Sequence, residues 1–181
     1  YEPIVRCSYD PNDKLINPSR TGDYIQFDEE LIYTVRFQNT GNDVAYDVRI
    51  EDEIDPNLDL STFRILGSSH YEVLNTSIED RLVTFNFRDI FLPDSTADKQ
   101  GSNGHVMYAI KQLDSLNEFT PVENTASIFF DLNPPVITNT TKNEMVSSIL
   151  DLDGDGYLGI IDCDDENVEI NQGATEIPNN S

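Results

Sequence analysis

The stretch LIYTVRFQNTGNDVAYDVRIED, residues 31–52, decides the fold class. Apolar and polar side chains alternate within 31–38, and this period of two is typical of a strand with one face buried. The turn NTGND (39–43) follows, and alternation resumes in 43–52. The apolar faces would consist of Leu31, Tyr33, Val35 and Phe37, then Val44, Tyr46, Val48 and Ile50. We therefore predict two strands joined as a hairpin.

The same alternation recurs along the chain. Longer candidate strands cover 81–92, 104–113 and 125–132, and shorter ones cover 3–7, 23–27, 62–66 and 70–74. Prolines separate many of these segments, and helical periodicity is almost absent. Roughly seven to nine short strands are expected, which favours an all-β fold, an immunoglobulin-like β-sandwich.

The charge of the chain excludes several classes of partner. There are 34 acidic and 11 basic residues, giving a formal net charge of -23. Nucleic-acid binding requires lysine and arginine for the phosphates, so nucleic acid is not expected as a partner. No run of apolar residues is long enough for a transmembrane helix, so membrane insertion is not expected either. The acidic excess favours solubility or cation binding.

Negative charge is concentrated near the C-terminal end. Nine acidic residues lie between Asp151 and Glu176, and the last basic residue is Lys142. The sequence thus divides into a moderately acidic body and an extremely acidic tail.

The segment DLDGDGYLGIID (151–162) has the spacing of a calcium loop. Asp151, Asp153 and Asp155 supply carboxylates at alternate positions, and the glycine after them permits the sharp turn. Tyr157 would offer its backbone carbonyl, and Asp162 takes the closing position usually held by glutamate. We expect one Ca²⁺ ion here, in preference to Mg²⁺ or to an acidic linker that needs only to be solvated.

The flanking residues do not form the two amphipathic helices of an EF-hand, so a structural site is expected rather than a sensor. DCDDEN (162–167) continues the pattern. Asp164, Asp165 and Asn167 are candidate ligands of a second Ca²⁺ that would share Asp162.

A third candidate cation site would lie at one end of the sandwich. Its oxygens would come from Asp10, Asn12, Asp13, Asp131 and Asn133. Because Asp and Asn also form turns by bonding their own backbone around proline, the turn-forming role is the favoured interpretation.

No catalytic constellation is apparent. His70 and His105 are the two histidines, and neither lies at metal-ligand spacing, so both are expected to be structural. Cys7 and Cys163 lie far apart and could pair with each other, pair outside these residues, or remain free. An enzyme is therefore not expected.

The tail resembles a known repeat. DLDGDGYLGIIDCDDEN and the following INQGATEIPNN are similar to the metal-binding repeat of many secreted bacterial proteins and, in their logic, to thrombospondin type 3 repeats. The resemblance implies calcium bound by short Asp-rich units, and implies that the partner of Cys163 lies beyond Ser181.

The body has a resemblance of its own. It is carried by CSYDPNDK (7–14), FQNTGND (37–43), LDLSTFRILGSSH (58–70), FNFRDIFLPDS (85–95) and FFDLNPPVITNTT (129–141). These motifs resemble a conserved β-sandwich repeat of unknown function from large secreted proteins of Bacteroidota. The resemblance implies a secreted or cell-surface location in a modular chain and no catalytic activity.

The predicted organisation is a β-sandwich over 1–142, a linker over 143–150 that could dock, and a truncated calcium repeat over 151–181. The predicted function is that of a non-catalytic extracellular structural or adhesion module. Its expected partners are neighbouring domains of the same chain and other copies in a surface assembly or filament. Two alternatives remain open, a module that recognises glycan or protein and an accessory domain of a secreted hydrolase.

Overall fold

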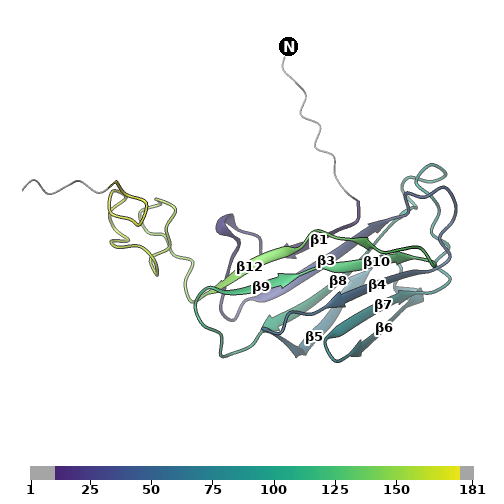
Figure 1. Cartoon of the computed structure of the whole chain (residues 1–181), viewed down its shortest axis with the longest axis horizontal. Coiled ribbons are helices and arrows are strands. Elements are labelled where there is room, and N and C mark those ends of the chain that lie inside the picture. Colours follow the sequence, from purple (N-terminus) through teal and green to yellow (C-terminus); the bar gives the residue numbers. More distant parts are fainter. Residues whose placement is uncertain (1–10, 176–181) are drawn as a thin grey trace, which may run out of the picture.

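The computed structural model describes residues 11–175 and is almost entirely β (Figure 1). The described part contains twelve strands and two short 3-10 helices. The strands are β1 (Asp13–Asn17), β2 (Tyr24–Gln26), β3 (Glu30–Gln38), β4 (Val48–Glu53), β5 (Leu58–Ser68), β6 (Leu74–Glu79), β7 (Leu82–Phe87), β8 (Asn103–Gln112), β9 (Thr120–Asn124), β10 (Ala126–Phe130), β11 (Val136–Ile137) and β12 (Thr141–Val146). The 3-10 helices are η1 (Thr21–Asp23) and η2 (Tyr71–Val73). The all-β sandwich prediction is confirmed.

The strands form three sheets. The first has the order β1-β3-β8-β5, the second β11-β10-β4-β7-β6, and the third β2-β12-β9. The pairs are antiparallel except β2 with β12, which run parallel. The first two sheets face each other, so alternate side chains of each point into the space between them.

The hairpin predicted for residues 31–52 is wrong. The first strand forms as expected, with Leu31, Tyr33, Val35 and Phe37 buried. However, β3 pairs with β1 and β8, whereas β4 lies in the second sheet between β10 and β7. The connection between β3 and β4 crosses from one sheet to the other. It is held by hydrogen bonds to Leu92, whose carbonyl accepts from the Asn39 side chain and from the amide of Ala45. Tyr46, predicted to face the core, is exposed in this connection.

Other predicted strands agree with the structure to differing degrees. The segments 81–92, 104–113 and 125–132 contain β7, β8 and β10, with Val83, Phe85 and Phe87 of β7 buried as their alternation predicts. The segment 70–74 instead forms η2 and the first residue of β6, and 3–7 lies outside the described residues. Strands β1, β9, β11 and β12 were not predicted, because their sequences are short, polar or rich in turn residues.

The core lies between the first two sheets and is rich in aromatic rings. Phe85 of β7 stacks on Tyr108 of β8 with ring centroids 5.8 Å apart, and it contacts Phe63 at 6.3 Å. Phe37 contacts Phe87 at 5.3 Å. Position 104 opposite Phe37 must be glycine, since a Cβ there would lie 2.2 Å from the ring. Such ring pairs add specific geometry to the area that they bury.

The sandwich continues past the boundary expected at residue 142. Strand β12 runs to Val146 and pairs with both β2 and β9, and Met145 and Val146 are fully buried. Residues 143–146 are thus part of a sheet rather than a linker, and the connection to the acidic segment begins at Ser147. Within residues 11–175 the structure has no helix long and apolar enough to span a membrane.

Candidate metal centre

The acidic segment follows β12 and folds into compact turns (Figure 1). Along 151–157 the odd-numbered residues are half-buried and the even-numbered residues are exposed, so the carboxylates face inward. Leu158 is the buried apolar side chain of the segment, with 8% of its surface exposed. The amide of Gly159 donates to the carbonyl of Leu150 at 2.8 Å, which closes the loop.

Three of the predicted ligands converge. Asp151, Asp153 and Asp155 each place a carboxylate oxygen within 4.8 Å of the others. Gly154 and Gly156 between and after them have φ of 77° and 95°, a region that side chains with a Cβ disfavour. The glycines therefore let the backbone turn sharply enough to bring alternate carboxylates to one side.

Backbone amides hold these carboxylates in place. Asp151 accepts from Gly154 at 2.8 Å and from Gly156 at 3.0 Å. Asp153 accepts from the amide of Asp155 at 3.1 Å, and Asp155 accepts from that of Tyr157 at 2.8 Å. Each Asp uses one or both oxygens to bond the backbone two to five residues ahead, the local pattern that Asp favours in turns.

Two carboxylate oxygens remain without a partner. Oδ2 of Asp153 and Oδ2 of Asp162 are buried and accept no hydrogen bond in the described structure. Desolvation, with the neighbouring charges of Asp155, Asp162 and Asp151, raises the pKa of Asp153. Asp162 therefore lies near the other three acids, and a cation among them would relieve both the repulsion and the unsatisfied oxygens.

The structure adds a residue that sequence reasoning missed. Asn171 donates from Nδ2 to Oδ2 of Asp155 at 2.6 Å, which ties the later turn to the loop. Gly173 lets the Tyr157 hydroxyl approach, because a Cβ at that position would lie 2.2 Å from the oxygen. The motif INQG carries an Asn and a Gly spaced for a turn, but no local pattern indicates which acid the Asn contacts.

The candidate ligands of a second ion do not form a group of three converging acids like that of the first site. Asp165 accepts from the amide of Leu152 at 3.1 Å and so lies beside the first loop. Asp164 accepts weakly from the amide of Glu166 at 3.4 Å, and Asn167 accepts from that of Glu169 at 3.2 Å. Among the described residues, only the Asp151, Asp153 and Asp155 group brings three acidic ligands together.

The candidate oxygens at the sandwich end have other partners. Asn12 accepts from the amide of Gln38, and Asp13 forms a bidentate ion pair with Arg36 at 2.6–2.7 Å. Asp131 accepts from the amides of Tyr46 and Asp47. Asn133 donates its backbone amide to Phe130 in a turn, and Asp10 lies outside the described residues. These contacts are those of turn and sheet formation.

Two further sequence features can be placed. Oγ of Ser69 contacts Nδ1 of the adjacent His70 at 2.7 Å in an exposed turn, and burial lowers the pKa of His70. Cys163 is exposed and is not in a disulfide within the described residues, and Cys7 lies outside them.

Several solved structures with a similar fold are major pilins. Domains D2 and D3 of the major pilin SpaD from Corynebacterium diphtheriae match with TM-score 0.53 and 16% identity, covering 72% of this chain and 51% of that chain. The major pilin BcpA of Bacillus cereus, in its D312A form, matches with TM-score 0.53 and 15% identity over 74% and 39% of the two chains. The chain thus spans about half or less of these pilins.

The major pilin SpaA of C. diphtheriae, described as pointing to a modular pilus assembly with stabilizing isopeptide bonds, matches with TM-score 0.51 and 12% identity. That match covers 75% of this chain and 38% of SpaA. At these identities the likeness establishes the sandwich fold. No curated protein matches the sequence significantly. A family model matches residues 10–144, and the chain therefore belongs to the family described as domain of unknown function (DUF7619).

Proposed function

We propose that this chain is a non-catalytic structural module of an extracellular, multidomain protein, in which a β-sandwich is followed by a segment that folds around Ca²⁺. Its partners are neighbouring domains of its own chain and other copies in a surface assembly or filament. The observation that carries the proposal is the convergence of the carboxylates of Asp151, Asp153 and Asp155.

Charge and hydrogen bonding support calcium as the ion. The three acids, with Asp162 beside them, offer carboxylate oxygens, and Tyr157 would contribute a backbone carbonyl at the loop position where calcium loops use one. Ca²⁺ accepts six to eight oxygens in flexible geometry, whereas Mg²⁺ requires near-ideal octahedral geometry. Without an ion, the segment has one buried apolar residue and many like charges, so bound Ca²⁺ would stabilise its folded form by mass action.

The sandwich supports a structural role. Its core is filled by aromatic and aliphatic side chains, and its fold is similar to that of the major pilins SpaD and SpaA, the latter described as pointing to a modular pilus assembly. In this arrangement the sandwich would be a stable spacer, and the calcium-bound segment would limit bending at its C-terminal end.

Removal of two central ligands is expected to abolish calcium binding at the first site. In calorimetric titration of EDTA-treated protein, the parent should bind one or two Ca²⁺ ions, with dissociation constants no weaker than about 10⁻³ M. The Asp153→Asn, Asp155→Asn variant should bind one ion fewer.

A matched control carries Glu166→Gln and Glu169→Gln, which remove the same charge from exposed positions of the same segment. This control should retain the parent stoichiometry. If the parent binds no Ca²⁺ at millimolar concentration, or if the control loses as much binding as the double Asp variant, the calcium proposal is wrong.

A second candidate function, recognition of a ligand, is favoured by one observation. Tyr46 and Phe91 are 59% and 56% exposed, and their rings meet edge to face at 5.7 Å. Leu132 is fully exposed nearby, since Asp131 accepts from the amide of Tyr46. Exposed aromatic side chains of this kind are frequent anchors in binding surfaces.

Recognition at this patch would be tested by replacing Tyr46 and Phe91 with serine and screening both proteins on immobilised glycans and extracellular matrix proteins. The parent should bind a ligand that the variant does not, while circular dichroism of the two proteins remains the same. Absence of a ligand that distinguishes them removes this candidate and leaves the structural role.

A further inference from the structure

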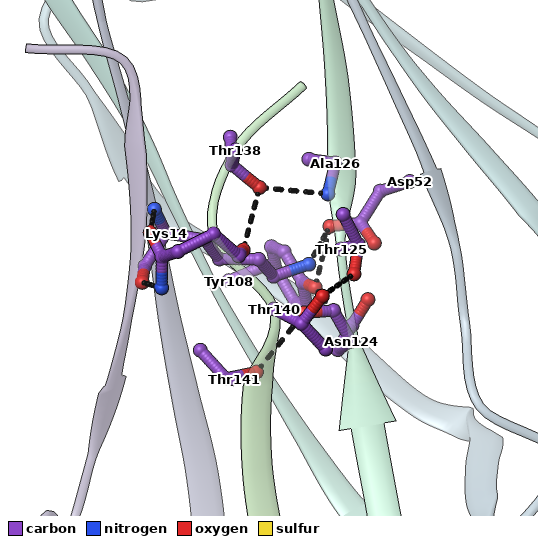
Figure 2. Close-up of polar contacts among 10 residues, drawn as sticks. Lys14, Asp52, Tyr108, Asn124, Thr125, Ala126, Thr138, Thr140 and Thr141 are labelled. Carbon is purple, nitrogen blue, oxygen red and sulfur yellow. Dashed lines mark hydrogen bonds and ion pairs between the residues drawn. The ribbon is translucent and has the colours of Figure 1, made fainter. Parts of the chain in front are cut away.

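A buried polar cluster lies inside the sandwich, remote in sequence from the acidic segment (Figure 2). Lys14 of β1 has a side chain with no exposed surface, and its Nζ lies 2.5 Å from Oδ2 of Asp52 in β4. The Tyr108 hydroxyl of β8 donates to the same carboxylate oxygen at 2.7 Å. Asn124, at the end of β9, donates from Nδ2 to the Tyr108 hydroxyl at 3.0 Å. Four strands thus place an amine, a carboxylate, a hydroxyl and a carboxamide in one hydrogen-bonded chain.

This cluster is not explained by stability alone. Enclosing a lysine and an aspartate costs more desolvation free energy than most ion pairs return. In addition, Oδ1 of Asp52 and Oδ1 of Asn124 are buried without a hydrogen-bond partner. Buried polar atoms without partners are rare in folded proteins, and several together at one place indicate a chemical role or a structure that changes after folding.

The surroundings weaken the hold of the Lys14 amine on its proton. Burial lowers the pKa of Lys14 to about 8, with the charge of Asp52 opposing the shift, so a useful fraction of the amine is neutral near physiological pH. A neutral, desolvated lysine amine is a nucleophile. Burial also raises the pKa of Tyr108 well above its ordinary value, so this hydroxyl keeps its proton and can pass one along the chain.

Asn124 is the carboxamide placed to react. Asn139 also contacts Lys14, but its side chain accepts from the backbone amide of Lys14 and donates to its backbone carbonyl, each at 2.9 Å. Those two bonds engage both polar atoms of Asn139 with the lysine backbone. The Asn124 amide, in contrast, lies on the same hydrogen-bonded chain as the Lys14 amine, and its carbonyl oxygen has no partner.

We propose that Lys14 and Asn124 become joined by an intramolecular amide bond, with Asp52 as the acid–base group. The Nζ atom attacks Cγ of Asn124, and Asp52 accepts a proton from Nζ. The proton passes through the Tyr108 hydroxyl to Nδ2, the Cγ–Nδ2 bond breaks, and ammonia leaves. An amine and a primary amide become a secondary amide and ammonia, and Asp52 returns to its starting state, so no oxidant or cofactor is required.

The bond would connect the first described strand to β9 across the interior. It requires only folding, because the pairing of β1 with β3 and of β3 with β8 places the Lys14 amine beside Tyr108, and Asn124 donates to the Tyr108 hydroxyl. The proposal does not depend on calcium binding by residues 151–162.

Mass spectrometry of the purified, fully denatured protein tests this. The intact mass should be lower than the sequence mass by one ammonia molecule. After digestion with trypsin, cleavage beyond Lys14 should be absent, and peptide 7–20 should be found linked to peptide 112–142, with fragmentation placing the link at Asn124. Peptide mapping is needed because cyclisation at Asn103–Gly104 would release ammonia without a cross-link.

Two variants define the outcome. Asp52→Asn should retain the full sequence mass and release peptide 7–14, whereas Lys142→Arg, which alters an exposed lysine, should keep the cross-link. Because the parent protein is itself measured, a variant that fails to fold does not leave the question open. A parent with the full sequence mass, or with free peptides 7–14 and 112–142, or with a link at Asn139, would overturn the proposal.

Discussion

Replacement of Asp52 by alanine is expected to lower the free energy of unfolding by about 3–5 kcal/mol, because the amide bond to Asn124 cannot form without Asp52 and the free Lys14 amine then stays buried without a counter-charge. The side chains of both residues have no exposed surface, so water cannot solvate the orphaned amine. The Tyr108 hydroxyl would also lose its acceptor. Urea denaturation followed by circular dichroism would measure the change.

Two comparisons isolate the cause of that loss. Asp114→Ala removes an acid of equal charge from an exposed turn and should change stability by no more than about 0.5 kcal/mol. The double variant Lys14→Met, Asp52→Leu should be more stable than Asp52→Ala alone, because no unpaired charge is then buried. Equal stability of the Asp52→Ala and Asp114→Ala proteins would show that Asp52 does not stabilise the fold through the buried cluster.

Replacement of Phe85 by alanine is expected to cost about 3–5 kcal/mol, since it opens a cavity where the two principal sheets meet. Phe85 is fully buried, stacks on Tyr108 and contacts Phe63. Thermal denaturation should show a large fall in midpoint, and binding of a hydrophobic dye should increase as the packing loosens.

Phe91→Ala is the matched control for the core prediction. It deletes the same side chain at a position that is 56% exposed, so it should change stability far less. A Phe85→Ala protein as stable as the Phe91→Ala protein would mean that the sheets close over the cavity, and that the aromatic contacts do not set the separation of the sheets.

Alternation predicted the individual strands better than their pairing. The buried positions of β3 and β7 follow from a period of two, which is a local property. Whether two successive strands pair or separate into different sheets depends on contacts such as that of Asn39 with Leu92, which are distant in sequence. Strands β9 and β12 were not predicted because their burial comes from packing in the third sheet, where β12 lies between β2 and β9, rather than from apolar composition.

The two polar sites differ in what the sequence reveals. The ligands of the acidic loop are close together in the sequence, so the spacing of its carboxylates and glycines predicts the site. Its contact with Asn171 comes from a later turn and could not be predicted in this way. The interior cluster unites residues from four strands. The sequence signals this cluster only through Asp52. This residue lies on the same face of β4 as the buried Val48 and Ile50, which is an unusual position for a charged side chain.

The parallel pairing of β2 with β12 has a consequence for how the sandwich would respond to tension. Because Tyr24, Ile25 and Gln26 face Glu144, Met145 and Val146 in the same direction, a pull on the chain before β2 and after β12 draws the strands past each other. All hydrogen bonds of the pair then carry force in shear at once, whereas an antiparallel pair pulled from one end opens bond by bond. Strand β12 would therefore resist a force applied to the chain after it, because the hydrogen bonds to β2 must break together.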